Sequence, residues 1–192
     1  MEKKTILVKN GIVIDGTGKP GRRADIRIRN GMIERIAEAL QPADGEMLLP
    51  ADGLCVCPGF IDAHTHFDLD VCNTTTADDF ETGSVAAVCG GTTMVIDFAC
   101  PNKGESLQYG LDLWHRKADG RSSCDYSFHM TIDDWNESIK AEVPKMFEQG
   151  ITSFKMYMTY PAMMIGDKDL FLALEELHKY GAIAGVHCEN AG

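Results

Sequence analysis

Residues Gly59-Phe60-Ile61-Asp62-Ala63-His64-Thr65-His66 decide the fold of this chain. The stretch begins at a glycine, continues through a short apolar run and ends in polar side chains. Four further runs rich in Val, Ile, Phe or Met follow, separated by helical patterns. Short strands that alternate with helices are typical of repeated βα units and predict a parallel sheet. We expect strands at about Gly59–Ala63, Thr92–Phe98, Asp125–Met130, Thr152–Met158 and Ala182–His187.

Helix signals fill the spaces between these strands. Asp78, Ser106 and either Asp167 or Asp169 can accept hydrogen bonds from a first helical turn, as N-cap residues do. Pro144 predicts a kink or a restart, because proline has no N–H to donate to the helix. We expect the helices to run from the three caps to Val88, Ala118 and Gly181, with a fourth at Ser138–Gln149.

The pattern before residue 58 is different. Residues 5–15 and 25–36 alternate apolar and polar side chains around Asn10-Gly11 and Asn30-Gly31. Asn-Gly is the dipeptide that tight type I′ turns prefer, so both stretches predict β-hairpins. We therefore divide the chain into a β portion over residues 1–57 and a βα portion over residues 58–192.

Composition narrows the class of protein without assigning a function. The 192 residues are 44% hydrophobic and 24% charged, which is ordinary for a globular chain. The formal net charge of −11 argues against a nucleic-acid partner, because such binding relies on clustered Lys and Arg. No apolar run approaches the roughly 20 residues that span a bilayer, so we expect no membrane partner and a cytoplasmic location.

His64 and His66 stand at the end of the first βα strand. Residues i and i+2 of a strand point to the same face, so the two imidazoles should point together. The carboxyl ends of parallel strands are where β/α barrels place their active sites, and two neutral imidazoles there can hold a divalent ion. A pair of ordinary exposed or hydrogen-bonded histidines fits the same spacing, so the pair alone leaves both interpretations open.

Lys155 lies in an otherwise apolar strand, where an unpaired ammonium is costly and needs a partner. One interpretation is a salt bridge to an inward carboxylate such as Asp97. The other is reaction of the amine with carbon dioxide to give a carbamate that bridges metal ions. His187 occupies the equivalent place on the fifth strand, so three strand ends each present a potential ligand.

Four motifs together resemble the hydantoinase/dihydropyrimidinase branch of the amidohydrolase superfamily, over essentially the whole chain. The resemblance implies an α/β protein: a TIM-like β/α barrel of the metal-dependent hydrolase type, here truncated after about five strands, with a small portion of a composite β-sandwich before it. The motifs are Gly59-Phe-Ile-Asp-Ala-His-Thr-His, Gly90-Gly-Thr-Thr, Ser153-Phe-Lys-Met-Tyr-Met and Val186-His-Cys-Glu-Asn.

The resemblance also implies roles for single residues. His64 and His66 would bind the more buried of two divalent ions, usually zinc. Lys155, carboxylated by carbon dioxide, would bridge both ions, and His187 would bind the second. Tyr160 matches the family tyrosine that hydrogen-bonds the substrate amide and the developing oxyanion, and its spacing from Lys155 favours hydantoinases over allantoinases.

The implied reaction is hydrolysis of the cyclic amide bond of a dihydropyrimidine or a 5-substituted hydantoin by a metal-activated hydroxide. The substrate would be a small cyclic amide or ureide, and the full-length enzyme a homo-oligomer, often a tetramer. The catalytic aspartate of the last barrel strand and a further metal-binding histidine of the sixth strand are expected outside these 192 residues. We expect the piece alone to be inactive and poorly stable, because an open barrel exposes a strand edge and an apolar face.

Three alternatives remain open at this point. An allantoinase or a dihydroorotase would share the His-x-His pair and the bridging lysine. A non-catalytic scaffold protein related to dihydropyrimidinase would keep the fold and lose the ligands, whereas His64, His66, Lys155 and His187 are all present. A small metal-binding module would need only the ligands that this chain contains.

Overall fold

The computed structural model describes residues 5–71 and 73–190. These residues belong to two compact units, one ending at Pro58 and the other beginning at Gly59. No helix in the described part of the chain is long and apolar enough to cross a membrane. All the candidate site residues lie in the second unit.

The first unit is a five-stranded sheet in the order β3-β2-β1-β4, with β5 also paired to β1. Pairing is antiparallel along β1, β2 and β3, whereas β4 and β5 run parallel to β1. A small core of Val8, Val13, Ala24, Ile26 and Ala51 covers one face. The strands are β1 (Thr5–Val13), β2 (Arg22–Arg29), β3 (Met32–Ala37), β4 (Met47–Pro50) and β5 (Cys55–Val56).

One of the two predicted hairpins is confirmed and the other is wrong. Asn30 and Gly31 join β2 to β3 with φ values of 54° and 78°, as a type I′ turn requires. Asn10-Gly11 instead lies inside β1 as a β-bulge, where one extra residue is inserted opposite β2. Asp25 stabilises the bulge by accepting the Asn10 N–H at 2.8 Å. Glycine is needed next, since a Cβ at Gly11 would lie 2.5 Å from the Val56 side chain.

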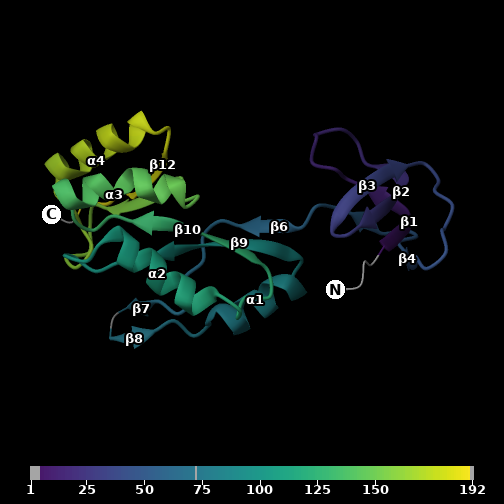
Figure 1. Ribbon diagram of the computed structural model, residues 1–192, viewed down its shortest axis with the longest axis horizontal. Coiled ribbons are helices and arrows are strands. Elements are labelled where there is room, and N and C mark those ends of the chain that lie inside the picture. The colour runs from purple at the N-terminus through teal and green to yellow at the C-terminus, as the bar shows by residue number, and fades with distance from the viewer. Residues whose placement is uncertain (1–4, 72, 191–192) are drawn as a thin grey trace. The chain divides into compact units, whose positions relative to one another are not determined.

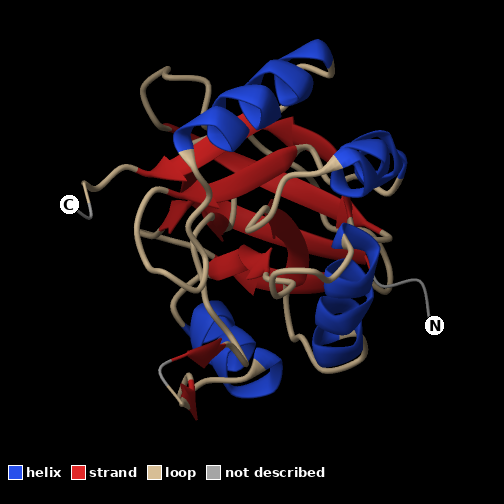
Figure 2. Ribbon diagram, turned by 90° about the vertical axis from the view of Figure 1, so that its left-hand side faces the viewer, coloured by secondary structure: helices blue, strands red, loops and turns tan. Residues whose placement is uncertain are grey.

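The second unit is built on five parallel strands in the order β12-β11-β10-β9-β6, as the sequence predicts. Figure 1 shows the helices α1 to α4 following one another along this sheet, and Figure 2 shows them outside its strands. A short hairpin, β7 (Asp70–Val71) with β8 (Thr74–Thr75), lies between β6 and α1. The sheet strands are β6 (Phe60–Asp62), β9 (Thr92–Ala99), β10 (Asp125–Thr131), β11 (Ser153–Tyr157) and β12 (Ile183–His187).

The helices are α1 (Phe80–Cys89), α2 (Leu107–Ala118), α3 (Glu137–Glu148) and α4 (Asp167–Lys179). Ser106 caps α2 as predicted, whereas the other caps differ. Asp79 and not Asp78 caps α1, because its carboxylate accepts two first-turn N–H groups while Thr82 completes a capping box. Asn136 caps α3, which continues through Pro144 without a restart, and the N-cap of α4 is Gly166.

Alternation along the strands separates two environments. On β11, Phe154 and Met156 are fully buried in the core between the sheet and the helices. The residue between them, Lys155, points to the opposite face, which is the inner face of the barrel curve. The helix layer therefore provides the hydrophobic stability, and the inner face is free for polar side chains.

Candidate metal centre

His64 and His66 follow the end of β6 at Asp62 and lie in an irregular segment. Their rings are nevertheless adjacent, with centroids 5.1 Å apart in an edge-to-face arrangement. Both rings rest on the Phe98 ring, at 4.6 Å and 4.8 Å between centroids. The two imidazoles are thus together, as expected, but an aromatic ring on β9 and not strand geometry arranges them.

The surroundings of His66 disfavour its protonated form and lower its pKa. Burial is the main reason why its pKa is lowered, and the neighbouring His64 and Lys155 lower it further, against the opposing charge of Asp97. Its Nδ1 atom is buried and has no hydrogen-bond partner within the described part of the chain. A half-buried imidazole whose buried nitrogen has no hydrogen-bond partner is chemically suited, in its neutral form, to donate a lone pair to a metal ion.

Lys155 lies next to this pair on the inner face. Its ammonium is 5.0 Å from the centre of the Tyr157 ring and 5.8 Å from that of Phe98. Together with His64, Phe98 and His129 it lines a hollow of about 150 Å³. Among the residues that the structure describes, no carboxylate lies within ion-pair distance of Lys155.

The interpretation in which Asp97 pairs with Lys155 is wrong. Asp97 is fully buried and accepts a hydrogen bond from Trp114 of α2, which places its side chain on the helix side of β9. The next residue, Phe98, points to the inner face with the histidines. Alternation along one strand thus separates Asp97 from Lys155. Burial raises the pKa of Asp97, and hydrogen bonds from Phe67, Thr65, Trp114 and Phe98 oppose that rise.

His187 and Tyr160 form a second group. Tyr160, in the loop after β11, lies 5.1 Å from the His187 ring and 6.1 Å from the Tyr157 ring, between centroids. His187 Nε2 is 2.9 Å from a carboxylate oxygen of Glu189. Tyr157 connects the two groups, because its ring also contacts the Lys155 ammonium.

The donor types in these two groups fit a divalent ion such as Zn²⁺, which prefers imidazole nitrogen and anionic oxygen ligands. The side chains as placed do not form a closed cage: no three His, Cys, Asp or Glu of residues 5–71 and 73–190 are close enough together to hold an ion. His64 and His66 are the only two of the expected imidazole donors whose rings are in contact within that part of the chain. Lys155, which lines the same hollow as His64, is a further candidate donor next to this pair.

Comparison with known proteins identifies the family of this chain. Residues 55–192 match the amidohydrolase family. The chain belongs to the amidohydrolase family. It is 39% identical to a dihydropyrimidinase of Dictyostelium discoideum, over 97% of this chain and 37% of that protein. It is 41% identical to a D-hydantoinase of Geobacillus stearothermophilus, over 97% of this chain and 39% of that protein.

Solved structures give the same result. A crystal structure of a D-hydantoinase matches this amidohydrolase with a TM-score of 0.92 and 39% identity, over 97% of this chain and 40% of the other. The five parallel strands are therefore part of the metal-dependent hydrolase barrel. The chain spans about 40% of the length of the relatives it matches.

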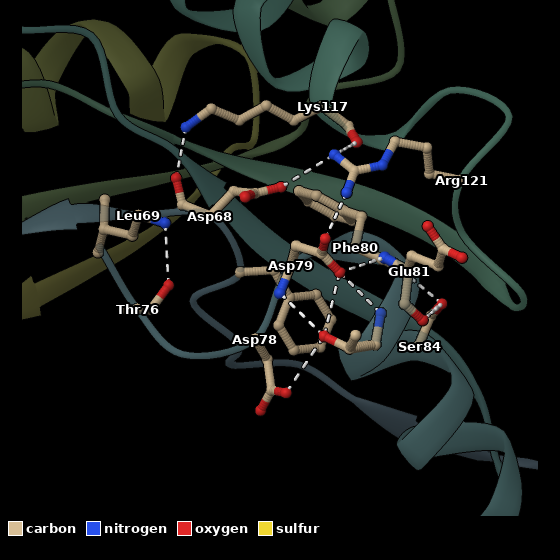
Figure 3. A network of polar contacts seen from close by, with 12 residues as sticks. Asp68, Leu69, Thr76, Asp78, Asp79, Phe80, Glu81, Ser84, Lys117 and Arg121 are labelled. Carbon is tan, nitrogen blue, oxygen red and sulfur yellow. Dashed lines mark hydrogen bonds and ion pairs between the residues drawn. The ribbon is translucent and has the colours of Figure 1, made fainter.

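A polar network holds the loop that follows the histidines of this amidohydrolase (Figure 3). Asp68 has a left-handed backbone with φ of 52°, and its carbonyl accepts a hydrogen bond from Lys117 of α2. Arg121 pairs with Asp68 at 3.4 Å and also with Asp79, the cap of α1. Two cations from the end of α2 thus tie the loop to the start of α1 and restrict its movement beside the site.

The sequence-based interpretation missed two inner-face residues. His129, which the motifs do not include, lines the hollow, with Nε2 2.9 Å from the Ala63 carbonyl and Nδ1 2.6 Å from Ser153 Oγ. Phe98 supports three histidine rings, including that of His129 at 4.8 Å. Alternation divides the residues of each predicted strand into two sets that point to opposite faces of the sheet. The sequence alone did not show which set points to the inner face, so His129 and Phe98 could not be assigned to it.

Proposed function

We propose that this amidohydrolase forms part of a cyclic amidase that opens the ring of a dihydropyrimidine or a 5-substituted hydantoin by hydrolysis. The observation that carries the proposal is the unpaired Lys155 amine beside the contacting His64 and His66 rings. The names of the relatives, dihydropyrimidinase and D-hydantoinase, support the substrate class. The relatives are longer than this chain, so the proposal concerns the full-length gene product.

In this proposal, His64 and His66 would hold one ion and His187 a second, and Lys155, as a carbamate formed with carbon dioxide, would supply anionic oxygen ligands. Two divalent ions, zinc in the first instance, would lower the pKa of a water molecule and polarise the ring carbonyl. Burial and neighbouring positive charge lower the pKa of His66, which favours the neutral imidazole that a metal ion requires. His187 would exchange its contact with Glu189 for the ion.

Tyr160 is proposed to bind the substrate through its phenol, which can donate a hydrogen bond to the carbonyl oxygen as negative charge develops there. Its ring is 47% exposed and lies against His187. Its backbone has φ of 66°, a left-handed conformation that is unfavourable for tyrosine. Such outliers cluster at functional sites, where the surrounding structure compensates for the strain.

Replacing Tyr160 with phenylalanine should lower kcat by about 100-fold, because one donor to the developing oxyanion is lost. Metal content should stay unchanged, since the phenol is not a metal ligand in this proposal. Steady-state kinetics of the purified full-length gene product would measure the effect. Tyr180→Phe is the matched control, because Tyr180 packs on Phe147 at the end of α4. Equal activity of the two variants would remove Tyr160 from the site.

Two other functions are less well supported. A scaffold protein without catalysis would have no need for an unpaired lysine beside two histidines in a hollow. An allantoinase or a dihydroorotase would use the same metal-binding residues. The names of the relatives and the position of Tyr160 favour a hydantoinase or dihydropyrimidinase over these two enzymes. Assembly into a homo-oligomer such as a tetramer and a cytoplasmic location complete the proposal, as expected from the sequence.

The test is ring opening by the full-length gene product, purified with zinc and bicarbonate. Dihydrouracil and 5-phenylhydantoin should be opened, and allantoin and dihydroorotate should not. Removal of the metal by a chelator should abolish the activity, and added zinc should restore it. A folded, metal-loaded protein that opens none of the four rings would support the scaffold function instead.

A further inference from the structure

Asp97 is the most fully hydrogen-bonded buried side chain near the two histidines. It is 0% exposed, and its carboxylate accepts four hydrogen bonds. One oxygen, Oδ2, accepts from Thr65 Oγ1 and from the Phe67 backbone N–H, both at 2.8 Å. The other oxygen, Oδ1, accepts from the Trp114 indole N–H at 3.0 Å and from the Phe98 backbone N–H at 2.7 Å.

Asp97 Oδ2 accepts hydrogen bonds from the residues directly before and after His66. Thr65 separates His64 from His66, and Phe67 follows His66 directly. The segment has left the regular strand β6 at this point, and its remaining backbone contact with β9 is a long one, from Thr65 N to the Ile96 carbonyl at 3.4 Å. The Asp97 carboxylate therefore provides the short hydrogen bonds that hold this part of the chain in place.

The second oxygen connects the same carboxylate to α2. Trp114 is 3% exposed within the core between the sheet and the helices. Its ring also lies under the Lys117 ammonium at 4.3 Å, and Lys117 hydrogen-bonds the Asp68 carbonyl. Asp97 is thus fixed by the helix layer on one side and fixes the histidine segment on the other.

Phe67 provides an independent reason why the segment cannot shift freely. Its ring packs on α1 at Gly83, where a Cβ would lie 2.3 Å from the Phe67 ring. Phe67 also stands edge-to-face with Phe80 at 5.5 Å. The close approach leaves the Phe67 N–H directed at Asp97, so packing and hydrogen bonding place the segment together.

We propose that Asp97 is the positioning residue for the His64 and His66 imidazoles. It fixes the backbone on both sides of His66, so that both rings can bind the same metal ion. This inference rests on the proposed function, because it concerns the same metal site. Asp97 does not touch the ion in this arrangement; it acts through Thr65 and Phe67. Partners that orient metal ligands typically change metal affinity by about 10- to 100-fold when they are removed.

Asp97→Asn is the decisive variant. Three of the four donors are N–H groups that can only donate, so both carboxylate oxygens are needed as acceptors. Asparagine has the same shape but replaces one oxygen by an NH₂ group, which must face a donor whichever way the amide is turned. Asp133→Asn is the matched control: Asp133 is also buried, at 7% exposed, and among the described residues no hydrogen bond links it to the histidine segment.

The measurement is metal binding by the full-length gene product, not its activity. The metal-free proteins would be titrated with Zn²⁺ against a chromophoric chelator, and with Co²⁺ while the visible absorption is recorded. We expect about 10- to 100-fold weaker binding of the tighter ion in Asp97→Asn, with altered Co²⁺ bands. Asp133→Asn should match the wild type in both respects.

A purely structural role for Asp97 would lower thermal stability and leave the affinity and the Co²⁺ spectrum of the folded protein unchanged, which would overturn the inference. If Asp97→Asn does not fold, Thr65→Val removes one donor and keeps the side-chain shape, and Trp114→Phe removes another donor with a smaller ring in the core. Unchanged metal affinity in both variants would also overturn the inference. A wild-type protein that binds no Zn²⁺ would overturn the proposed function as well. Wild-type binding together with wild-type affinity in Asp97→Asn would overturn this inference alone.

Discussion

Replacing Lys155 with alanine should lower ring opening by the full-length gene product at least about 1,000-fold, the largest effect that we expect of any single substitution. The proposed metal site depends on an amine that no carboxylate neutralises among the described residues and that lies beside His64, His66 and Phe98. Alanine leaves the apolar strand intact and removes only the bridging group. Loss of activity should therefore be accompanied by loss of bound metal and not by unfolding.

Two measurements separate this effect from a general one. Protein prepared with ¹³C-bicarbonate should show a carbamate signal by NMR, which should be absent from Lys155→Ala. Lys140→Ala is the control, because Lys140 lies on α3 and forms long ion pairs, at 3.9 Å, with Glu137 and Glu176 of the helices. Full activity of Lys155→Ala, or a carbamate signal that survives the substitution, would contradict the proposed site.

Asp133→Asn should stabilise the protein at pH 8 and have much less effect at pH 4. Asp133 follows β10, is 7% exposed, and has one carboxylate oxygen that is buried without a hydrogen-bond partner in the described part of the chain. Burial raises its pKa to about 7, with a small opposing effect of Lys103. In the unfolded chain the same carboxyl has its ordinary pKa of 3.8.

These two pKa values determine whether the free energy of unfolding rises or falls with pH. Between pH 4 and pH 7 the folded protein keeps a proton on Asp133 that the unfolded chain releases, so the free energy of unfolding falls as the pH rises through this window. Above pH 7 the full cost is present, on the order of 4 kcal/mol as an upper bound. Asparagine cannot ionise and removes this dependence.

Urea unfolding at pH 4 and pH 8 would measure the difference. The neighbouring Asp134→Asn is the control, because Asp134 is only partly buried and hydrogen-bonds Asn136 at 3.2 Å. Parallel stability profiles for the wild type and Asp133→Asn across this pH range would show that Asp133 has a partner or reaches solvent in the folded protein.

Most of the barrel portion was predictable from local patterns. Each of the five parallel strands lies within one residue of its expected bounds at both ends, because an apolar run that starts at a glycine and ends in polar residues is a local property. Helix caps were less predictable. Asp78 and Asp79 are both good cap residues, and α1 is capped by Asp79. A contact distant in sequence holds Asp78 outside the helix, because the Asp68 N–H donates to the Asp78 carbonyl at 3.0 Å.

The N-terminal sheet shows the same limit. Asn30-Gly31 and Asn10-Gly11 are identical dipeptides within similar alternating patterns, yet one is a turn and the other a bulge. The difference comes from Asp25, which binds the Asn10 N–H and the Lys9 ammonium from the neighbouring strand. A dipeptide preference is a local property, whereas the position of its hydrogen-bond partners is not.

The candidate site divides in a similar way. The amino-acid sequence by itself determined the strands, the donor types at three strand ends and the family resemblance, because these depend on residue type and spacing along one chain. Only the tertiary structure decided that Phe98 supports the histidine rings, that Asp97 faces α2 and not Lys155, and that His129 lines the hollow. Those facts depend on which face of each strand meets the helices, and that face is chosen when the strands pair and the helices pack against them.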